Sequence, residues 1–340
     1  MSEYYKIGYI WDGYLDKVTR EDMNILTHVN IAFGLVENGR IKICHLKNID
    51  YIKKLREYNP DIKILLSVGG WGAGGFSNDA STSEGCLKFA ESGYEAYKIL
   101  GLDGIDIDWE YPCSDSAGID ASPDDKYNFT AMIKNLREAL PKPAMLTIAA
   151  GAGEYFIEGT EMEKVQKELD YVQLMTYDMC RGDMTTHHTN LYSSNKNIKN
   201  SVDFSVNLFN KAGVPLDKII IGAAFYSREW KNIKFDGSVI NGGLYQKTGN
   251  ETGFAGSGPK YTDIRDNFIN QNGYIKYWDD IAKAPYLFNE NNGHFITYDD
   301  EESIKYKCEY VKKTGIKGIM YWEHSCDPKR YLLNAIKNNL

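Results

Sequence analysis

The sequence predicts an α/β protein, a (β/α)8 TIM barrel with a small α+β insertion between strands seven and eight. Three observations lead to this fold. Eight short apolar segments alternate with amphipathic ones, which is typical of parallel strands joined by helical crossovers. The chain of 340 residues holds one barrel of about 250 residues, with about 90 to spare. No Gly-x-Gly-x-x-Gly follows the first strand, which weighs against a doubly wound dinucleotide-binding sheet.

The expected strands are apolar runs that begin, in chain order, near Ile7, Val29, Ile64, Gly104, Leu146, Tyr171, Ile219 and Gly318. Between them lie amphipathic stretches that predict surface helices, among them 48–58, 125–140 and 301–314. Ser122 and Pro123 followed by two acids form a suitable helix start, because a hydroxyl caps the first turn and acids favour the positive end of the helix dipole. A further helix is expected over 328–339.

The extra residues lie before the last strand. The gap between Ile219 and Gly318 is more than twice any other gap between successive strand starts. Its central part, 229–292, is rich in Gly, Asn, Lys and Tyr and predicts short strands and turns. We therefore expect a barrel formed by 1–228 and 293–340, with 229–292 as a subdomain on the loop after strand seven, where barrels carry active sites.

Composition narrows the range of ligands. The net charge of −8 argues against nucleic acid and anionic membranes as partners. Aromatic residues form 13% of the chain, which suits the binding of sugar faces, although tyrosine is also common in protein cores and on protein surfaces.

The six cysteines form no Cys-x-x-Cys pair, so no metal and no cofactor are expected, and their disulfide status stays open. We expect a monomer. The N-terminus lacks the basic and apolar segments of a signal peptide.

The strongest functional signal is an acidic strand at 103–112. Side chains of a strand alternate, so Asp106, Asp108 and Glu110 share one face and the apolar residues between them share the other. In a barrel the acids point inward, with Glu110 nearest the C-terminal mouth. Burial and mutual repulsion should raise the pKa of at least one acid. The alternatives are a solvated acidic face or a magnesium site.

Five segments together resemble a known family. Residues 103–112 read Asp-Gly-Ile-Asp-Ile-Asp-Trp-Glu-Tyr-Pro and resemble the signature of glycoside hydrolase family 18, the chitinases and related endo-N-acetylglucosaminidases. The other segments follow the family order: 67–71 (Ser-Val-Gly-Gly-Trp), 175–178 (Met-Thr-Tyr-Asp), 225–228 (Phe-Tyr-Ser-Arg) and 320–323 (Met-Tyr-Trp-Glu). Two departures are Ser227 in place of the usual Gly, and the lack of a tryptophan soon after Asp178. The resemblance covers nearly the whole chain.

The resemblance implies a chitinase that acts with retention and uses the substrate's own N-acetyl group. In that chemistry the acetamido oxygen attacks the anomeric carbon and forms an oxazolinium ion, which water then opens. Glu110 would protonate the glycosidic oxygen, Asp108 would orient the acetamido group, and Asp106 would support Asp108. Tyr177 would hydrogen-bond the acetamido carbonyl and Asp178 would hold the distorted sugar.

The resemblance and the expected strand faces also imply a sugar-binding set, with chitin or chito-oligosaccharides as the partner. Its members are Trp71, Trp322, Met175, Arg228, Tyr226, Tyr9, Phe33 and Ser67. Tyr9 and Ser67 would support Asp106, and core packing is the alternative for Tyr9 and Phe33. His187 and His188 are interpreted as loop residues, because metal-type spacing is missing.

Alternatives to a chitinase are an endo-β-N-acetylglucosaminidase acting on N-glycans or peptidoglycan, and a non-catalytic chitin-binding lectin. In the lectin class the terminal Glu of the acidic motif is typically replaced, whereas Glu110 is present here. The substrate favours an extracellular site of action, while the N-terminus leaves a cytoplasmic location or non-classical export open. The sequence does not separate exo from endo cleavage.

Overall fold

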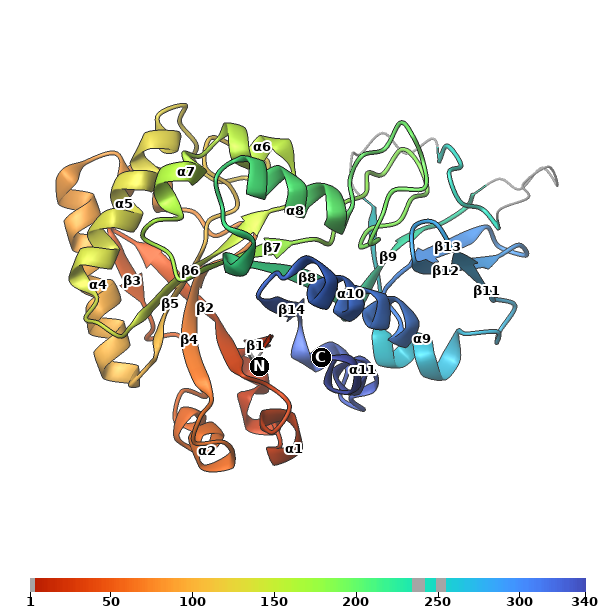
Figure 1. Ribbon diagram of the computed structural model, residues 1–340, viewed down its shortest axis with the longest axis horizontal. Helices are drawn as coiled ribbons and strands as arrows, with labels where there is room; N and C mark the ends of the chain where they lie inside the picture. The colour runs from red at the N-terminus through yellow and green to blue at the C-terminus, as the bar shows by residue number, and fades with distance from the viewer. Residues whose placement is uncertain (1–3, 234–241, 249–254) are drawn as a thin grey trace. The chain divides into compact units, whose positions relative to one another are not determined.

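The computed structural model describes residues 4–233, 242–248 and 255–340. Its largest sheet is a closed barrel in the strand order β1-β14-β8-β7-β6-β5-β4-β2, and β1 pairs with β2 to complete the ring (Figure 1). The barrel strands are β1 (Tyr5–Trp11), β2 (His28–Glu37), β4 (Lys63–Gly69), β5 (Gly104–Asp108), β6 (Met145–Gly151), β7 (Tyr171–Met175), β8 (Ile219–Ala224) and β14 (Gly318–Trp322). Each predicted strand start falls within one of them, so the predicted (β/α)8 barrel is confirmed.

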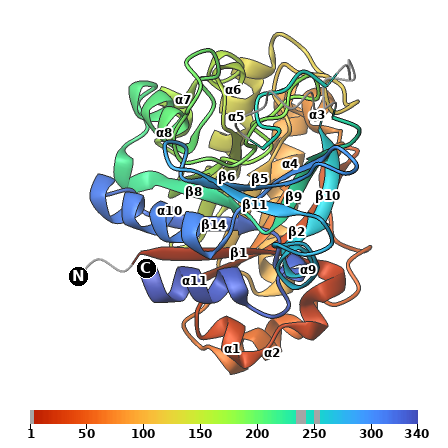
Figure 2. The same cartoon turned by 90° about the vertical axis from the view of Figure 1, so that its right-hand side faces the viewer.

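Helices connect the barrel strands, as expected for parallel neighbours, and a last helix follows β14. They are α1 (Arg20–Met23), α2 (Tyr51–Tyr58), α3 (Phe76–Ala80), α4 (Ser83–Leu100), α5 (Asp125–Ala139), α6 (Glu154–Glu158), α7 (Met162–Val165), α8 (Val202–Lys211), α10 (Glu301–Thr314) and α11 (Tyr331–Asn339). Helices α1 and α2, which follow the first two strands, lie side by side (Figure 2). The expected helices over 48–58 and 328–339 begin three residues later than predicted, at Tyr51 and Tyr331.

The outward face of β5 illustrates why the acidic strand is fixed in register. Ile105 and Ile107 are buried, and the following Trp109 stacks on Phe76 with ring centroids 5.3 Å apart. Phe129 of α5 packs edge-on against the same indole. A shift by one residue would exchange these apolar side chains for carboxylates, so the packing holds the acids on the inner face.

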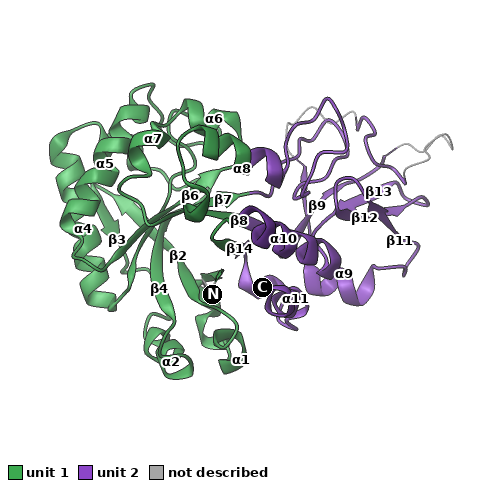
Figure 3. Cartoon of the chain, viewed as in Figure 1, with its two compact units in different colours: residues 1–175, 206–221, 315–320 green, residues 176–205, 222–314, 321–340 purple. Residues whose placement is uncertain are grey.

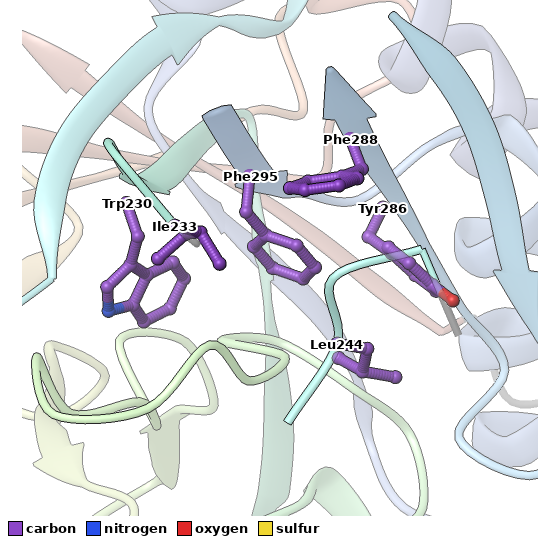
Figure 4. Packing of buried hydrophobic residues seen from close by; sticks show 6 residues of the cluster. All are labelled: Trp230, Ile233, Leu244, Tyr286, Phe288 and Phe295. Atoms are coloured by element: carbon purple, nitrogen blue, oxygen red, sulfur yellow. The ribbon is translucent and has the colours of Figure 1, made fainter. Parts of the chain in front are cut away.

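A second, five-stranded antiparallel sheet follows β8 along the chain. Its order is β10-β9-β13-β12-β11, formed by β9 (Tyr226–Trp230), β10 (Gly256–Lys260), β11 (Ile275–Asp279), β12 (Ala284–Asn289) and β13 (His294–Thr297), with helix α9 (Tyr261–Asn267). One face buries an apolar cluster of Trp230, Ile233, Leu244, Tyr286, Phe288 and Phe295 (Figure 4). Parts of the insertion predicted at 229–292, namely 234–241 and 249–254, lie outside the described residues. Its boundaries stay a prediction.

Contacts divide the chain into two compact units, coloured separately in Figure 3. The first contains 1–175, 206–221 and 315–320, and the second contains 176–205, 222–314 and 321–340. The acidic strand belongs to the first unit, whereas the segments after β7 and β8 belong to the second. The part of the chain that the structure describes contains no helix long and apolar enough to cross a membrane.

Candidate active site

In the first unit, β5 directs its acids toward the barrel interior. Asp106 is 0% exposed, Asp108 is 4% exposed and Glu110 is 9% exposed. Strand β5 ends at Asp108, so Glu110 lies just beyond the last paired residue. The rising exposure along the row makes Glu110 the acid with the best access to solvent, as expected for the carboxyl end of a barrel strand.

The carboxyl group of Asp106 accepts four side-chain hydrogen bonds. Oδ2 accepts from the Tyr9 hydroxyl at 2.9 Å and from Ser67 Oγ at 2.8 Å. Oδ1 accepts from Thr147 Oγ1 at 2.6 Å and from Gln173 Nε2 at 2.9 Å. Burial raises the pKa of Asp106, and the four hydrogen bonds oppose that rise. Two donors on each oxygen suit a carboxylate, which has no proton of its own to place.

Asp108 has a different environment. Burial raises its pKa well above the ordinary value, and the nearby charges of Glu110 and Asp106 raise it further. Its Oδ1 is buried and has no hydrogen-bond partner within the described residues. The difference between the two aspartates therefore assigns the proton of this inner pair to Asp108 and the negative charge to Asp106.

Two glycines at the end of β4 pack directly against this row. Gly69 has a φ of +119°, and a Cβ built there would lie 2.0 Å from the carbonyl oxygen of Asp108. Gly70 donates its backbone N–H to the same oxygen at 2.8 Å, and its own Cβ would lie 2.9 Å from the ring of Phe33. Only glycine allows this close approach, which accounts physically for the Gly-Gly pair in the 67–71 segment.

Aromatic side chains follow the ends of β4, β5 and β6. Trp71 is 55% exposed, and its ring centroid lies 6.2 Å from that of Tyr111. Tyr111 in turn lies 5.1 Å from the exposed Tyr155. Of the other predicted sugar contacts in this unit, Met175 is buried and Phe33 is half-buried. Trp71 therefore offers an open ring face, whereas Met175 does not.

In the second unit, Asp178 and Arg228 form a bidentate ion pair. Arg228 Nε and Nη2 each lie 2.6 Å from a different carboxylate oxygen, and Nη1 donates to Ser257 Oγ at 3.1 Å. Burial tends to raise the pKa of Asp178, but hydrogen bonds from Arg228 and His188 outweigh it and hold the pKa well below its ordinary value. Asp178 is therefore ionised at neutral pH.

His188 is the residue of this cluster that the sequence did not indicate. The side chain is fully buried, and the backbone N–H of Asp178 donates to its Nδ1 at 3.4 Å. Burial lowers the pKa of His188, so the ring is neutral. A single histidine in a polar segment carries no periodic signal, and only the folded chain brings it beneath Asp178.

Tyr226 lies against the same ion pair, next to other aromatic rings. Tyr226 lies 6.0 Å from Tyr177 and 5.4 Å from His188, measured between ring centroids, and the Arg228 guanidinium lies 5.3 Å from the Tyr226 centroid. Tyr177, Tyr226 and Trp322 are each half-buried. The second unit thus combines an ion pair with partly open aromatic faces, an arrangement suited to a sugar ring with polar edges.

The described residues contain no group of three or more His, Cys, Asp or Glu side chains arranged to hold a metal ion.

A family model described as glycosyl hydrolases family 18 matches residues 7–327. The chain belongs to this family. The matched range includes every predicted site residue from Tyr9 to Trp322, and membership classes the protein as a glycoside hydrolase.

Several known proteins are similar to this chain over most of its length. Chitinase A1 of Niallia circulans is 38% identical over 321 residues, covering 86% of this chain and 44% of the relative. Chitotriosidase-1 of Mus musculus is 28% identical over 92% of this chain and 70% of its own. A solved structure of a family 18 N-acetylglucosaminidase from Paenibacillus barengoltzii has a TM-score of 0.94 and 50% identity, covering 99% of this chain and 100% of the other. The chain thus spans less than half of chitinase A1 and the full length of the Paenibacillus chain.

Proposed function

We propose that this family 18 protein is a chitinase that cleaves β-1,4-linked N-acetylglucosamine polymers with retention, through substrate-assisted catalysis. The observation that carries the proposal is the buried row Asp106, Asp108 and Glu110, whose environments differ although their chemistry is alike. Neighbouring carboxyl groups with separated proton affinities allow one to donate a proton while another stays charged.

In the proposed reaction Glu110 gives its proton to the glycosidic oxygen as the bond to the leaving sugar breaks. The acetamido oxygen of the reacting sugar forms the new bond to the anomeric carbon, which gives an oxazolinium ion. Asp108 accepts a hydrogen bond from the acetamido N–H, and the single negative charge of the Asp106–Asp108 pair stabilises the positive charge of this ion. Glu110 then takes a proton from the water that opens the ring.

The remaining predicted residues are proposed to bind the sugar. Tyr177 would donate to the acetamido carbonyl, and Asp178, oriented by Arg228, would hold the distorted ring. The other proposed contacts are Trp71, Trp322, Met175, Tyr226 and Phe33, with Tyr9 and Ser67 supporting Asp106. We also propose that 229–292 forms a separate α+β subdomain.

A second candidate differs in where the polymer is cut. The Paenibacillus relative, 50% identical and matched over its whole length, is described as an N-acetylglucosaminidase. This supports preferential action on short chito-oligosaccharides, by release of residues from a chain end, over attack on the interior of chitin. We also propose that the protein is a monomer and that it acts on these soluble substrates outside the cell.

Two measurements test the proposal. We expect Glu110→Gln to abolish hydrolysis while oligosaccharide binding is kept, because the shape is unchanged and only the proton donor is lost. Near-normal turnover in that variant would remove Glu110 from its proposed role. The products formed from the N-acetylglucosamine hexamer and from a glycoprotein N-glycan distinguish a chitinase, an exo-acting enzyme and an endoglycosidase. Cleavage of the N-glycan alone would contradict a chitinase.

A further inference from the structure

The barrel interior contains a chain of hydrogen-bonded amides that ends on Asp106. Gln173 of β7 donates from Nε2 to Asp106 Oδ1 at 2.9 Å, and Asn30 of β2 donates from Nδ2 to Gln173 Oε1 at 3.0 Å. Both amides are 0% exposed. This series of hydrogen bonds therefore crosses the barrel interior from β2 through β7 to β5 without contact with solvent.

The two amides fix one another's orientation. An amide can present either its oxygen or its nitrogen to a neighbour, and the neighbour decides which orientation is stable. Because Asn30 donates to the oxygen of Gln173, the nitrogen of Gln173 is directed at Asp106. If Gln173 turned over, its oxygen would face the carboxylate and its nitrogen would face the donor group of Asn30.

This orientation leaves a polar atom of Asn30 without compensation. Asn30 Oδ1 is buried and has no hydrogen-bond partner within the described residues. An open acceptor in a barrel core is unfavourable, and an apolar residue at this position would remove it. Stability alone therefore does not account for an asparagine here, whereas fixing the donor on Asp106 does.

We propose that Asn30 and Gln173 are positioning residues that keep Asp106 ionised, so that the proton of the inner pair stays on Asp108. The inference rests on the proposed function, because it assigns a purpose to the acidic row. The titratable groups that face Asp106 are Tyr9 from β1, Asp108 from the acidic row and Tyr171 from β7, and Glu110 acts in turn on Asp108. Strands β4 and β6 contribute only the hydroxyls of Ser67 and Thr147.

Removal of the Gln173 donor gives a pH effect of known sign. Gln173→Met keeps the approximate volume but leaves Asp106 with three donors, so the pKa of Asp106 rises. The inner pair then takes up its second proton at a higher pH, and that fully protonated pair has no negative charge to stabilise the oxazolinium ion. We expect the acid limb of the pH–kcat profile to move up by about one to two pH units, the effect of one hydrogen bond to a charged group.

A paired variant separates positioning from folding. Gln173→Met leaves the Asn30 donor buried and unpaired, so this variant is also less stable. In Asn30→Val/Gln173→Met both partners are apolar, and we expect thermal stability to recover in part while the acid limb stays shifted. Asn289→Val, which removes a buried amide from β12 of the five-stranded sheet, is the matched control and should lower stability without moving the limb.

The assay is kcat and KM against pH on a soluble fluorogenic N-acetylchitobioside, with thermal unfolding measured in parallel. An acid limb that matches wild type in either Gln173 variant overturns the inference. The inference also fails if the limb returns to its wild-type position as stability recovers in the double variant, since the role of the amides is then structural. If wild type itself cleaves no N-acetylglucosamine oligomer, the proposed function fails instead, so the two failures are distinguishable.

Discussion

A buried ion pair in the second unit offers a quantitative test of what holds the segment after β7 in place. Lys307 of α10 is 0% exposed, and its Nζ lies 2.6 Å from Oδ2 of Asp299, which is 1% exposed. The same ammonium donates to Thr189 Oγ1 at 2.6 Å. Thr189 directly follows His188, so this pair anchors the segment that contacts Asp178.

Lys307→Met removes the cation and leaves the Asp299 carboxylate buried. Loss of one partner of a buried ion pair costs about 3–5 kcal/mol of unfolding free energy. Asp299 keeps three neutral donors, namely Thr189, Ser303 and the backbone N–H of Ala224, so we expect the lower end of this range. With an unfolding entropy of about 2.1 cal/mol/K per residue, about 3 kcal/mol lowers the Tm by about 4 °C.

An exposed pair with the same geometry is the control. Lys329 Nζ also lies 2.6 Å from an aspartate, Asp266, but the two side chains are 56% and 29% exposed. Lys329→Met should cost about 0–1 kcal/mol, because water solvates the charge left behind. Thermal and denaturant unfolding of both variants measures the difference. Equal losses in the two variants would refute the reasoning that burial, rather than distance, sets the value of the ion pair.

Three further predictions concern the site. Gly69→Ala should lower the Tm and kcat far more than Gly101→Ala, because both have positive φ but only the former clashes, at 2.0 Å from the Asp108 carbonyl oxygen; similar melting curves would contradict this. Asp108→Asn should stabilise the protein at pH 7. Between the ordinary pKa of 3.8 and the raised pKa of Asp108, only the folded state keeps this carboxyl group protonated, so the stability of the wild type falls as pH rises. The stability gained by Asp108→Asn should therefore vanish below pH 3.8. A gain in stability that is independent of pH would count against the raised pKa. Arg228→Met removes the hydrogen bonds and the charge that lower the pKa of Asp178, so this pKa should rise and activity at about pH 4–5 should fall more than at pH 7; an unchanged ratio of the two rates would rule this out.

Much of the fold could be predicted because it depends on local patterns. The apolar runs of the eight strands and the alternation of β5 are visible in the chain, and they locate Asp106, Asp108 and Glu110 on one inner face. Two helix starts were predicted three residues too early, because Asn48 and Pro328 favour a turn as readily as a first helical residue. Those helices begin instead at Tyr51 and Tyr331.

The polar layer around Asp106 could be predicted only in part. Tyr9 and Ser67 were expected to support this carboxyl group, and each donates to it. Gln173 donates to it as well, and Asn30 donates to Gln173, yet a buried amide on an apolar strand gives no sequence signal of its partner. Strands β2, β5 and β7 are far apart in the sequence, and barrel closure alone brings these side chains together.

The sequence by itself determined the barrel, its strand order along the chain, the acidic row and the family resemblance, because these depend on periodicity and on short motifs. Only the tertiary structure decided which aspartate keeps its charge and which residue lies beneath Asp178. The physical reason is that a proton's position depends on burial and on donors from several strands. Asp106 and Asp108 are two residues apart and chemically identical, and the four donors around Asp106 separate their roles.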